Sequence, residues 1–187
     1  KKVRQTLENN FITTYDNVLS KDQCQHLIDK FEDSQVQWQK TELEDHRSFT
    51  EININAYEDW KEYEKIIYTT LRPYIDKYAE KFKITHNWPK KFGWEQIRFK
   101  KYEVNGKDKF NEHVDVMDHA SAKRFLVFFL YLNDNTGGLT SFPEYDRMIT
   151  PKAGKLLMFP PLWTHKHIGH KPLEQPKYIV GSYLHYT

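Results

Sequence analysis

Three residues of the types that bind metal ions stand at a spacing that could place them around one ion. His113 and Asp115 lie two positions apart in the strand-like run Phe110–Asp115. Because residues i and i+2 of an extended strand point to the same face, this run predicts an imidazole and a carboxylate side by side. His167 follows much later in the chain. On a neighbouring strand it would complete two nitrogens and one oxygen on one side of a metal, leaving other positions open.

This donor set narrows the metal to a few candidates. Two histidines and one carboxylate form the facial arrangement of non-haem Fe(II) oxygenases, in which the open positions take O2 and a co-substrate. Zn²⁺ also binds such a set. The pair His113 and Asp115 is weak evidence by itself, because the chain has nine histidines and 26 acidic residues. A surface pair is the ordinary alternative.

Further residues around the pair follow a recognisable order. They are Tyr102, His113, Asp115, the apolar run Phe125–Leu132, Gly137-Gly138-Leu139-Thr140, Phe159-Pro160, His167 and Lys177. The segment from Tyr102 to Tyr183 resembles the 2-oxoglutarate- and Fe(II)-dependent oxygenases, specifically the prolyl 4-hydroxylase group. In that family a lysine stands ten residues after the distal histidine, as Lys177 does after His167.

The resemblance implies roles for the individual residues. His113, Asp115 and His167 would bind Fe(II), and Lys177 would bind the distal carboxylate of 2-oxoglutarate. A buried anion needs a fixed cation, although a solvated strand lysine is the common alternative. Tyr102 would hydrogen-bond the same carboxylate, provided that the loop after it carries an insertion; core packing explains a single tyrosine almost as well.

His165 is the rival of His167 as a ligand, because it lies two positions earlier and would share its face of a strand. The distance to Lys177 and the following Gly169 both favour His167.

The activity that the resemblance implies is hydroxylation of prolyl residues in peptides, in the manner of procollagen-proline 4-dioxygenase. The co-substrates would be 2-oxoglutarate and O2, the products succinate and CO2, and L-ascorbate is a candidate cofactor. Asp115 argues against the related halogenases, which lack this carboxylate. No arginine follows Arg147, whereas the nucleic-acid demethylases and lysyl hydroxylases of the superfamily use one there.

Two alternatives stay open. The same chemistry could act on another side chain, a free amino acid or a small metabolite. A protein of another class, a non-catalytic jelly-roll binding module, could retain the triad as a relic, although such a module needs no 2-oxoglutarate anchor at Lys177.

Substrate contacts are expected from two long stretches, Gln35–Arg47 and Val116–Ala122, which are interpreted as loops that cover the site. Trp38 and Arg47 are the candidates for peptide contact. Two departures from the family pattern, Leu139 and Tyr183, also concern the substrate side, and Tyr183 replaces a common tryptophan.

The remaining pattern predicts a single domain over residues 1–187, with a helix-containing part at 1–91 and a catalytic core at about 92–187. Twelve Phe, twelve Tyr and five Trp favour a sheet-rich core. Helices are predicted at Lys21–Asp33, which opens with a capping box, and at Glu58–Phe82, where Pro73 should kink or split the helix. The predicted class is α+β, mainly β; the resemblance implies a double-stranded β-helix (jelly roll) core with N-terminal supporting helices.

Composition bears on partners. The net charge is +2, and a lysine-rich stretch over residues 76–109 is interpreted as a solvated helix face and strand edge, so nucleic acid and membrane partners are not expected. One cysteine, Cys24, and no apolar leader-like segment favour an intracellular location. The pattern does not indicate an oligomeric state.

Overall fold

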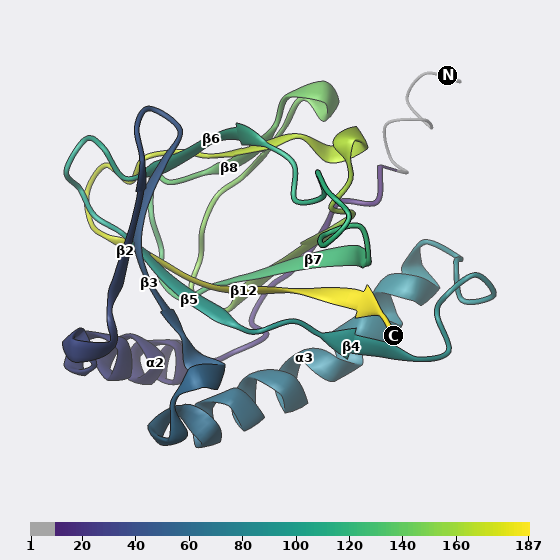
Figure 1. Ribbon diagram of the computed structural model, residues 1–187, viewed down its shortest axis with the longest axis horizontal. Helices are drawn as coiled ribbons and strands as arrows, with labels where there is room; N and C mark the ends of the chain where they lie inside the picture. The colour runs from purple at the N-terminus through teal and green to yellow at the C-terminus, as the bar shows by residue number, and fades with distance from the viewer. Residues whose placement is uncertain (1–9) are drawn as a thin grey trace.

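A single, strongly curled antiparallel sheet dominates the computed structural model, which describes residues 10–187. The strands follow the order β1-β10-β7-β12-β5-β3-β6-β11-β8-β9, with β2 added to β3 and β4 added to β12. Figure 1 shows the sheet folded over into an open half-barrel, with β6 and β8 facing β7, β12 and β5. This mainly β architecture is consistent with the predicted jelly-roll core.

The strands have the following bounds: β1 Thr13–Tyr15, β2 Gln39–Leu43, β3 Arg47–Asn53, β4 Phe92–Trp94, β5 Arg98–Tyr102, β6 Lys109–His113, β7 Arg124–Tyr131, β8 Thr140–Phe142, β9 Arg147–Ile149, β10 Lys155–Phe159, β11 His167–Gly169 and β12 Lys177–Tyr186.

Two α-helices, α2 (Lys21–Asp33) and α3 (Lys61–Lys81), cover the outer face of the sheet near β5 and β12 (Figure 1). The predicted capping box of α2 is confirmed, because the Gln23 amide donates to Ser20 Oγ and the Ser20 amide donates to Gln23 Oε1. The buried stripe of α2, which includes Cys24 and Phe31, packs against the sheet, where Phe31 stacks on Phe99 at 4.5 Å between ring centroids.

Pro73 was predicted to kink or split the helix; α3 continues through it as one helix, so a split does not occur. Buried Ile67 and Leu71 precede the proline, and buried Ile75 and Tyr78 follow it. We attribute the continuity to this packing on both sides of Pro73, which offsets the missing backbone hydrogen bond. Within residues 10–187, no helix combines the length and apolar character needed to cross a bilayer.

Strand β7 is a central strand, because it pairs with β10 on one side and β12 on the other. Its alternate residues serve two separate cores. Leu126, Phe128 and Leu130 join the cluster under the helices, whereas Val127 and Tyr131 join the cluster inside the half-barrel. The inner cluster includes Tyr102, and its residues line one side of the candidate site.

The stretch Gln35–Arg47 is not the long loop that was predicted. It forms a 3-10 turn, the edge strand β2 and the beginning of β3, which together make a hairpin. Residues on both faces of β2 are mostly exposed, so this strand lacks the apolar alternation that would have predicted it.

Candidate active site

The three predicted metal ligands meet at one end of β6. His113 is the last residue of β6 and lies directly across from His167, the first residue of β11. His113 Nε2 is 3.9 Å from Asp115 Oδ1, and His167 Nε2 is 3.5 Å from Asp115 Oδ2. One potential ligand atom from each residue lies within 4.8 Å of the others. The expected neighbouring-strand histidine is therefore confirmed in position.

Hydrogen bonds hold both imidazoles in the tautomer that a metal requires. Nδ1 of His113 lies 2.7 Å from the Asn111 carbonyl, and Nδ1 of His167 lies 3.1 Å from the His165 carbonyl. A carbonyl oxygen only accepts, so each Nδ1 carries the proton and donates it. Each Nε2 is then left with a free lone pair, which is the arrangement found in histidines that bind metals.

The donor set fits a divalent metal ion. His167 Nε2 and Asp115 Oδ2 are buried and have no hydrogen-bond partner among the described residues. Unpaired polar atoms in a protein interior are costly, and a metal ion at this point would satisfy both. Burial, followed by the neighbouring His167, lowers the pKa of His113 to about 2, so its imidazole is neutral and can act as a ligand.

Asp115 reaches the cluster by a different route from the predicted one, because β6 ends at His113. Three contacts hold it beyond the strand. Its amide donates to the Pro161 carbonyl at 3.0 Å, its carbonyl accepts from Arg124 at 2.8 Å, and its Oδ1 accepts from the Tyr183 hydroxyl at 2.7 Å. The strand argument placed the carboxylate correctly, but tertiary contacts rather than strand geometry orient it.

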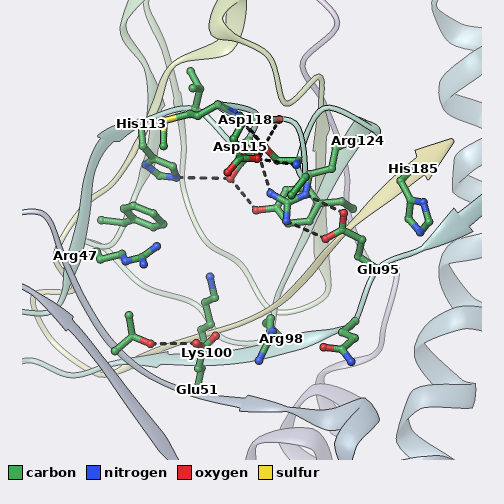
Figure 2. A pocket seen from close by; sticks show the side chains of 18 of the residues that line it. Arg47, Glu51, Glu95, Arg98, Lys100, His113, Asp115, Asp118, Arg124 and His185 are labelled. Atoms are coloured by element: carbon green, nitrogen blue, oxygen red, sulfur yellow. Dashed lines mark hydrogen bonds and ion pairs between the residues drawn. The ribbon is translucent and has the colours of Figure 1, made fainter.

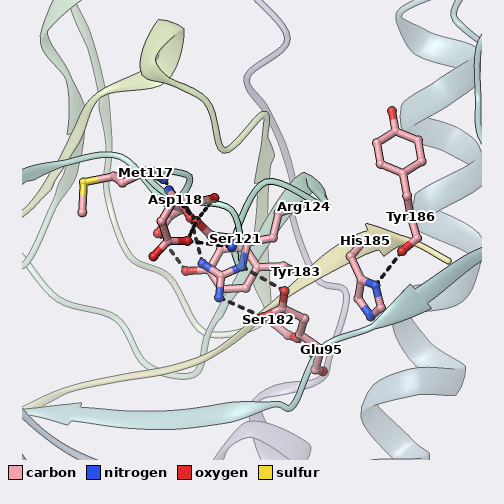
Figure 3. A network of polar contacts seen from close by, with 10 residues as sticks. Glu95, Met117, Asp118, Ser121, Arg124, Ser182, Tyr183, His185 and Tyr186 are labelled. Atoms are coloured by element: carbon pink, nitrogen blue, oxygen red, sulfur yellow. Dashed lines mark hydrogen bonds and ion pairs between the residues drawn. The ribbon is translucent and has the colours of Figure 1, made fainter.

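Arg124 is the centre of a polar network behind Asp115 (Figure 3). It makes two 2.9 Å hydrogen bonds to the carboxylate of Glu95, and its guanidinium lies 3.9 Å from the ring centroid of Tyr183. Sequence reasoning missed both Arg124 and Glu95, because nothing in either local pattern connects them. Tyr183, expected on the substrate side, contacts Asp115 directly and also lines the cavity.

His165 is turned away from the cluster. Its Nε2–H donates to the Asn10 carbonyl at 2.8 Å, and its ring stacks on Tyr145 at 5.2 Å between centroids. The preference for His167 over His165 therefore agrees with the geometry.

Lys177 lies in a narrow cavity that also reaches the triad. Its side chain is 2 % exposed, and its Nζ donates to the carbonyls of Gly138 at 3.0 Å and His170 at 3.4 Å. No carboxylate of the described residues pairs with it. Burial, and then the charge of Lys100, lower the pKa of Lys177 to about 7.

Gly138 and Tyr102 shape the surroundings of Lys177. Gly138 has a φ of +61°, and a Cβ there would lie 2.9 Å from Lys177 Cδ, so the lysine can lie over this backbone only because the residue is glycine. Tyr102 pairs with Lys177 across β5 and β12, and Lys177 Nζ lies 4.3 Å from its ring centroid. Tyr102 is thus beside the lysine, as predicted, and burial raises the pKa of its phenol.

Tyr131 and Thr140 complete this cavity, and their hydroxyls lie 2.6 Å apart. Tyr131 was missed because it stands in the apolar run of β7. The alternation of that strand, which turns Val127 and Tyr131 to the same face, was the available signal.

A wider cleft of about 790 Å³ opens from the triad toward solvent (Figure 2). Arg47 lines it, as expected, and so do Met117, Asp118 and Ser121 of the Val116–Ala122 segment. Trp38 does not. Its Nε1–H donates to the Phe31 carbonyl at 3.0 Å and its ring stacks on Phe31, so it packs with α2 on the outer face of the sheet. Trp38, predicted to contact the peptide, therefore does not line this cleft.

The lysine-rich stretch is also only partly a solvated face. Strand β5 is an interior strand between β12 and β3 rather than an edge. Lys101 is buried on its outer face, and Arg98 and Lys100 line the cleft on its inner face. Sequence periodicity could not distinguish these positions, because the alternating residues on both faces include cations.

Comparisons with known proteins agree with this geometry. Residues 97–185 match the family model of the 2OG-Fe(II) oxygenase superfamily. No curated protein sequence matches the chain significantly.

Several solved structures share the fold at low sequence identity. A viral collagen prolyl hydroxylase from Paramecium bursaria Chlorella virus-1, in complex with 2OG, has a TM-score of 0.67 and 17% identity, over 97% of this chain and 98% of that one. A prolyl hydroxylase from Trichoplax adhaerens, in complex with a hypoxia inducible factor peptide fragment, has a TM-score of 0.73 and 14% identity, over 97% and 86%. A Pseudomonas putida prolyl-4-hydroxylase has a TM-score of 0.65 and 15% identity, over 100% and 98%. Residues 97–185 thus match the 2OG-Fe(II) oxygenase superfamily, and the chain has a prolyl hydroxylase-like fold.

Proposed function

We propose that this protein is an Fe(II)- and 2-oxoglutarate-dependent dioxygenase that hydroxylates prolyl residues in peptides at C4. The observation that carries the proposal is one continuous arrangement: three ligand atoms, two of them buried without a partner, share a cavity with a buried lysine that lacks a carboxylate. A dianionic co-substrate that spans the metal and Lys177 would satisfy both ends of that cavity.

Each residue has a defined task in this proposal. His113 Nε2, His167 Nε2 and Asp115 Oδ2 hold the metal, while Tyr183 occupies Asp115 Oδ1 and so directs the other oxygen inward. Bound Fe(II) supplies the chemistry that couples O2 and 2-oxoglutarate, with release of succinate and CO2, to hydroxylation of a C–H bond. Lys177 binds the distal carboxylate of 2-oxoglutarate by a charge-assisted hydrogen bond. Tyr102 is proposed to donate its phenolic proton to the same group.

Aromatic rings keep the ligand cluster dry and in place. Phe110 stacks on the imidazole of His113 with a centroid distance of 3.4 Å and an interplanar angle of 6°. Phe142 and Phe159 pack against His167, with centroids 5.8 and 4.8 Å from its ring. With water kept away, the lone pairs of the ligands remain available to the metal, and competing hydrolytic reactions are reduced.

A peptidyl proline is favoured as substrate for two reasons. The solved structures of similar fold are described as prolyl hydroxylases, and one of them is described as a complex with a peptide. The wide, open cleft also suits an extended chain better than a buried metabolite. A proline-rich segment is already extended in polyproline II, so it loses little conformational entropy on binding.

The decisive experiment is mass spectrometry of proline-containing peptides, including collagen-like sequences, incubated with the protein, Fe(II), 2-oxoglutarate and O2. We expect a mass gain of one oxygen on proline, located by fragmentation, together with stoichiometric succinate. Parallel reactions with and without ascorbate test that cofactor, and Asp115→Ala is the control for metal dependence. Oxygen on another side chain or only on free proline would refute the substrate. If no peptide or amino acid elicits succinate, the non-catalytic alternative gains support.

A further inference from the structure

The inner face of β5 presents cations to the cleft. Residues of a strand alternate between its two faces, so Arg98, Lys100 and Tyr102 share one face while Phe99 and Lys101 share the other. Phe99 and Lys101 point toward the helices, whereas Arg98 and Lys100 line the cleft. Arg47, from the beginning of neighbouring β3, lines the same cleft. Figure 2 shows Lys100 and Arg98 across the cavity from His113 and Asp115.

None of these three cations makes an ion pair within 4.0 Å of a carboxylate in residues 10–187, although other cations of the molecule do. Arg124, in the same cleft, donates hydrogen bonds to both carboxylate oxygens of Glu95. The acid opposite Lys100 across the β3–β5 pair is Glu51, whose Oε1 accepts instead from the Thr41 hydroxyl at 3.0 Å.

The cleft as a whole carries an excess of positive charge. Its lining includes Arg47, Arg98, Lys100 and Lys123, whereas Glu51 and Asp118 are its only acids besides Asp115 and the Glu95 that pairs with Arg124. Asp115 belongs to the metal cluster, and a bound divalent metal adds further positive charge. An anion that enters this cleft is therefore attracted to it.

Of the three cations, Lys100 is the one that also lines the cavity of the metal triad. Its Nζ lies 4.5 Å from the ring centroid of Phe49 and 6.0 Å from that of Phe110, the ring that stacks on His113. Lys100 lines both the inner cavity and the outer cleft, whereas Arg47 and Arg98 line only the cleft. An anion held by all three would thus sit beside the reacting position. Burial lowers the pKa of Lys100, and an anionic partner would offset the cost of its charge.

We propose that Lys100, Arg98 and Arg47 bind a carboxylate of the substrate, so that the preferred substrate is a prolyl peptide with aspartate or glutamate next to the target proline. The oxidation step of this inference rests on the proposed function, but the binding preference can be measured without it.

The test uses fluorescence anisotropy of labelled peptides with the full chain, Fe(II) and 2-oxoglutarate without O2, so that binding occurs without turnover. The peptides carry Glu, Gln or Lys beside one proline and have both termini blocked. A charged hydrogen bond corresponds to about a tenfold or larger preference for Glu over Gln. We expect that preference, and we expect it to shrink as salt concentration rises.

Two substitutions test whether Arg98 and Lys100 cause the preference for the Glu peptide. Arg98→Gln and Lys100→Met should each remove most of the advantage of the Glu peptide while leaving the Gln peptide nearly unchanged. Arg72→Gln is the control, because it removes the same charge from an exposed pair with Asp76 on α3. Equal affinity for the Glu and Gln peptides, or a preference that survives in both Arg98→Gln and Lys100→Met, would overturn the proposal.

Two further arms separate related outcomes. A peptide that ends at proline with a free carboxylate is compared with its amide; if only that terminal carboxylate binds, the source is a chain end or free amino acid and the side-chain assignment is wrong. If Lys100→Met weakens 2-oxoglutarate and leaves the peptide preference intact, Lys100 belongs to the co-substrate, which also contradicts the proposal.

Admission of O2 to the same samples, followed by mass spectrometry, distinguishes failure of this inference from failure of the proposed function. Oxygen on proline at equal rates in the Glu and Gln peptides retains the function and rejects the inference. A preference for the Glu peptide in binding, without oxygen on proline, retains the inference and rejects the proposed function.

Discussion

Lys100 and Lys101 are adjacent on β5, but they lie in opposite environments. Lys101 faces α2, and its Nζ lies 2.8 Å from Glu32 Oε1 and 2.6 Å from Glu103 Oε1. Lys100 faces the cleft, where aromatic rings surround it and no carboxylate of the described residues pairs with it. At β5, therefore, the outer face of the sheet supplies carboxylate partners for its lysine, and the inner face does not.

The same contrast extends to the rest of the inner face. His167 Nε2 and Asp115 Oδ2 lack partners, and Lys177 donates only to backbone carbonyls. Because folded proteins pair nearly all buried polar groups, such a concentration of unmet groups indicates ligand binding. Substitutions on the inner face should thus alter ligand binding with little loss of stability, and those on the outer face should do the opposite.

The largest effect is expected at the metal ligands. Asp115→Ala removes one ligand and should abolish iron binding and succinate production, while the thermal unfolding midpoint without metal changes little. Metal content after dialysis and succinate release are the measurements. His165→Gln is the matched control, since it keeps a donor for the Asn10 carbonyl outside the cluster. Full turnover by Asp115→Ala would contradict the assignment of Asp115 as a metal ligand.

The second-largest effect is expected from Lys177→Met. It leaves the distal carboxylate of 2-oxoglutarate without its cation, a loss of about 2–5 kcal/mol for a desolvated pair. Titration of 2-oxoglutarate into Fe(II)-loaded protein without O2, followed by the metal-to-ligand absorption band, measures this loss. Iron affinity should be retained, and an unchanged dissociation constant for 2-oxoglutarate would assign the anchor to another group.

The affinity for 2-oxoglutarate should also depend on pH through Lys177. Its pKa is lowered to about 7 in the protein without ligand, so the ammonium form is lost as pH rises above that value. Binding of a carboxylate then requires proton uptake, and affinity should fall by up to about tenfold per pH unit above neutrality. Lys177→Met should bind weakly without this dependence. A wild-type affinity that stays constant between pH 7 and 9 would contradict the lowered pKa.

Tyr183→Phe should have a smaller effect. The change removes the hydroxyl that donates to Asp115 Oδ1 but keeps the ring under Arg124. Loss of a group that orients a metal ligand costs about 10–100-fold in metal affinity. Competition with a chelator of known affinity measures the change. Unaltered iron affinity would mean that the Arg124 and Pro161 contacts alone orient Asp115.

The smallest effect compares the two lysines directly. Lys101→Met leaves Glu32 and Glu103 without their cation, and should lower the free energy of unfolding by about 1–3 kcal/mol. Lys100→Met replaces an unpaired, half-buried cation by an apolar chain of similar length, so it should be neutral or stabilising. Urea denaturation of the two variants provides the comparison, and equal destabilisation by both would show that the two faces do not differ in this way.

Much of the site could be predicted from local pattern. Strand alternation predicts that His113 and Asp115 lie together, whereas the choice of His167 and the role of Lys177 come from the spacing implied by the family resemblance. Helix α2 was predicted to its bounds, since a capping box and an apolar stripe are both local signals. The hairpin of β2 and β3 was missed because an exposed edge strand has no apolar alternation.

The sequence by itself determined the donor types, their order and the strand that carries His113, because side-chain chemistry and strand alternation are local properties. Tertiary structure alone decided the rest. It brought Tyr183, Arg124 and Pro161 together to orient Asp115 beyond the end of β6. It also placed Trp38 against α2, and turned Lys100 into the cleft and Lys101 toward Glu32. These outcomes depend on which face of a curled sheet the helices cover, and no local pattern specifies that.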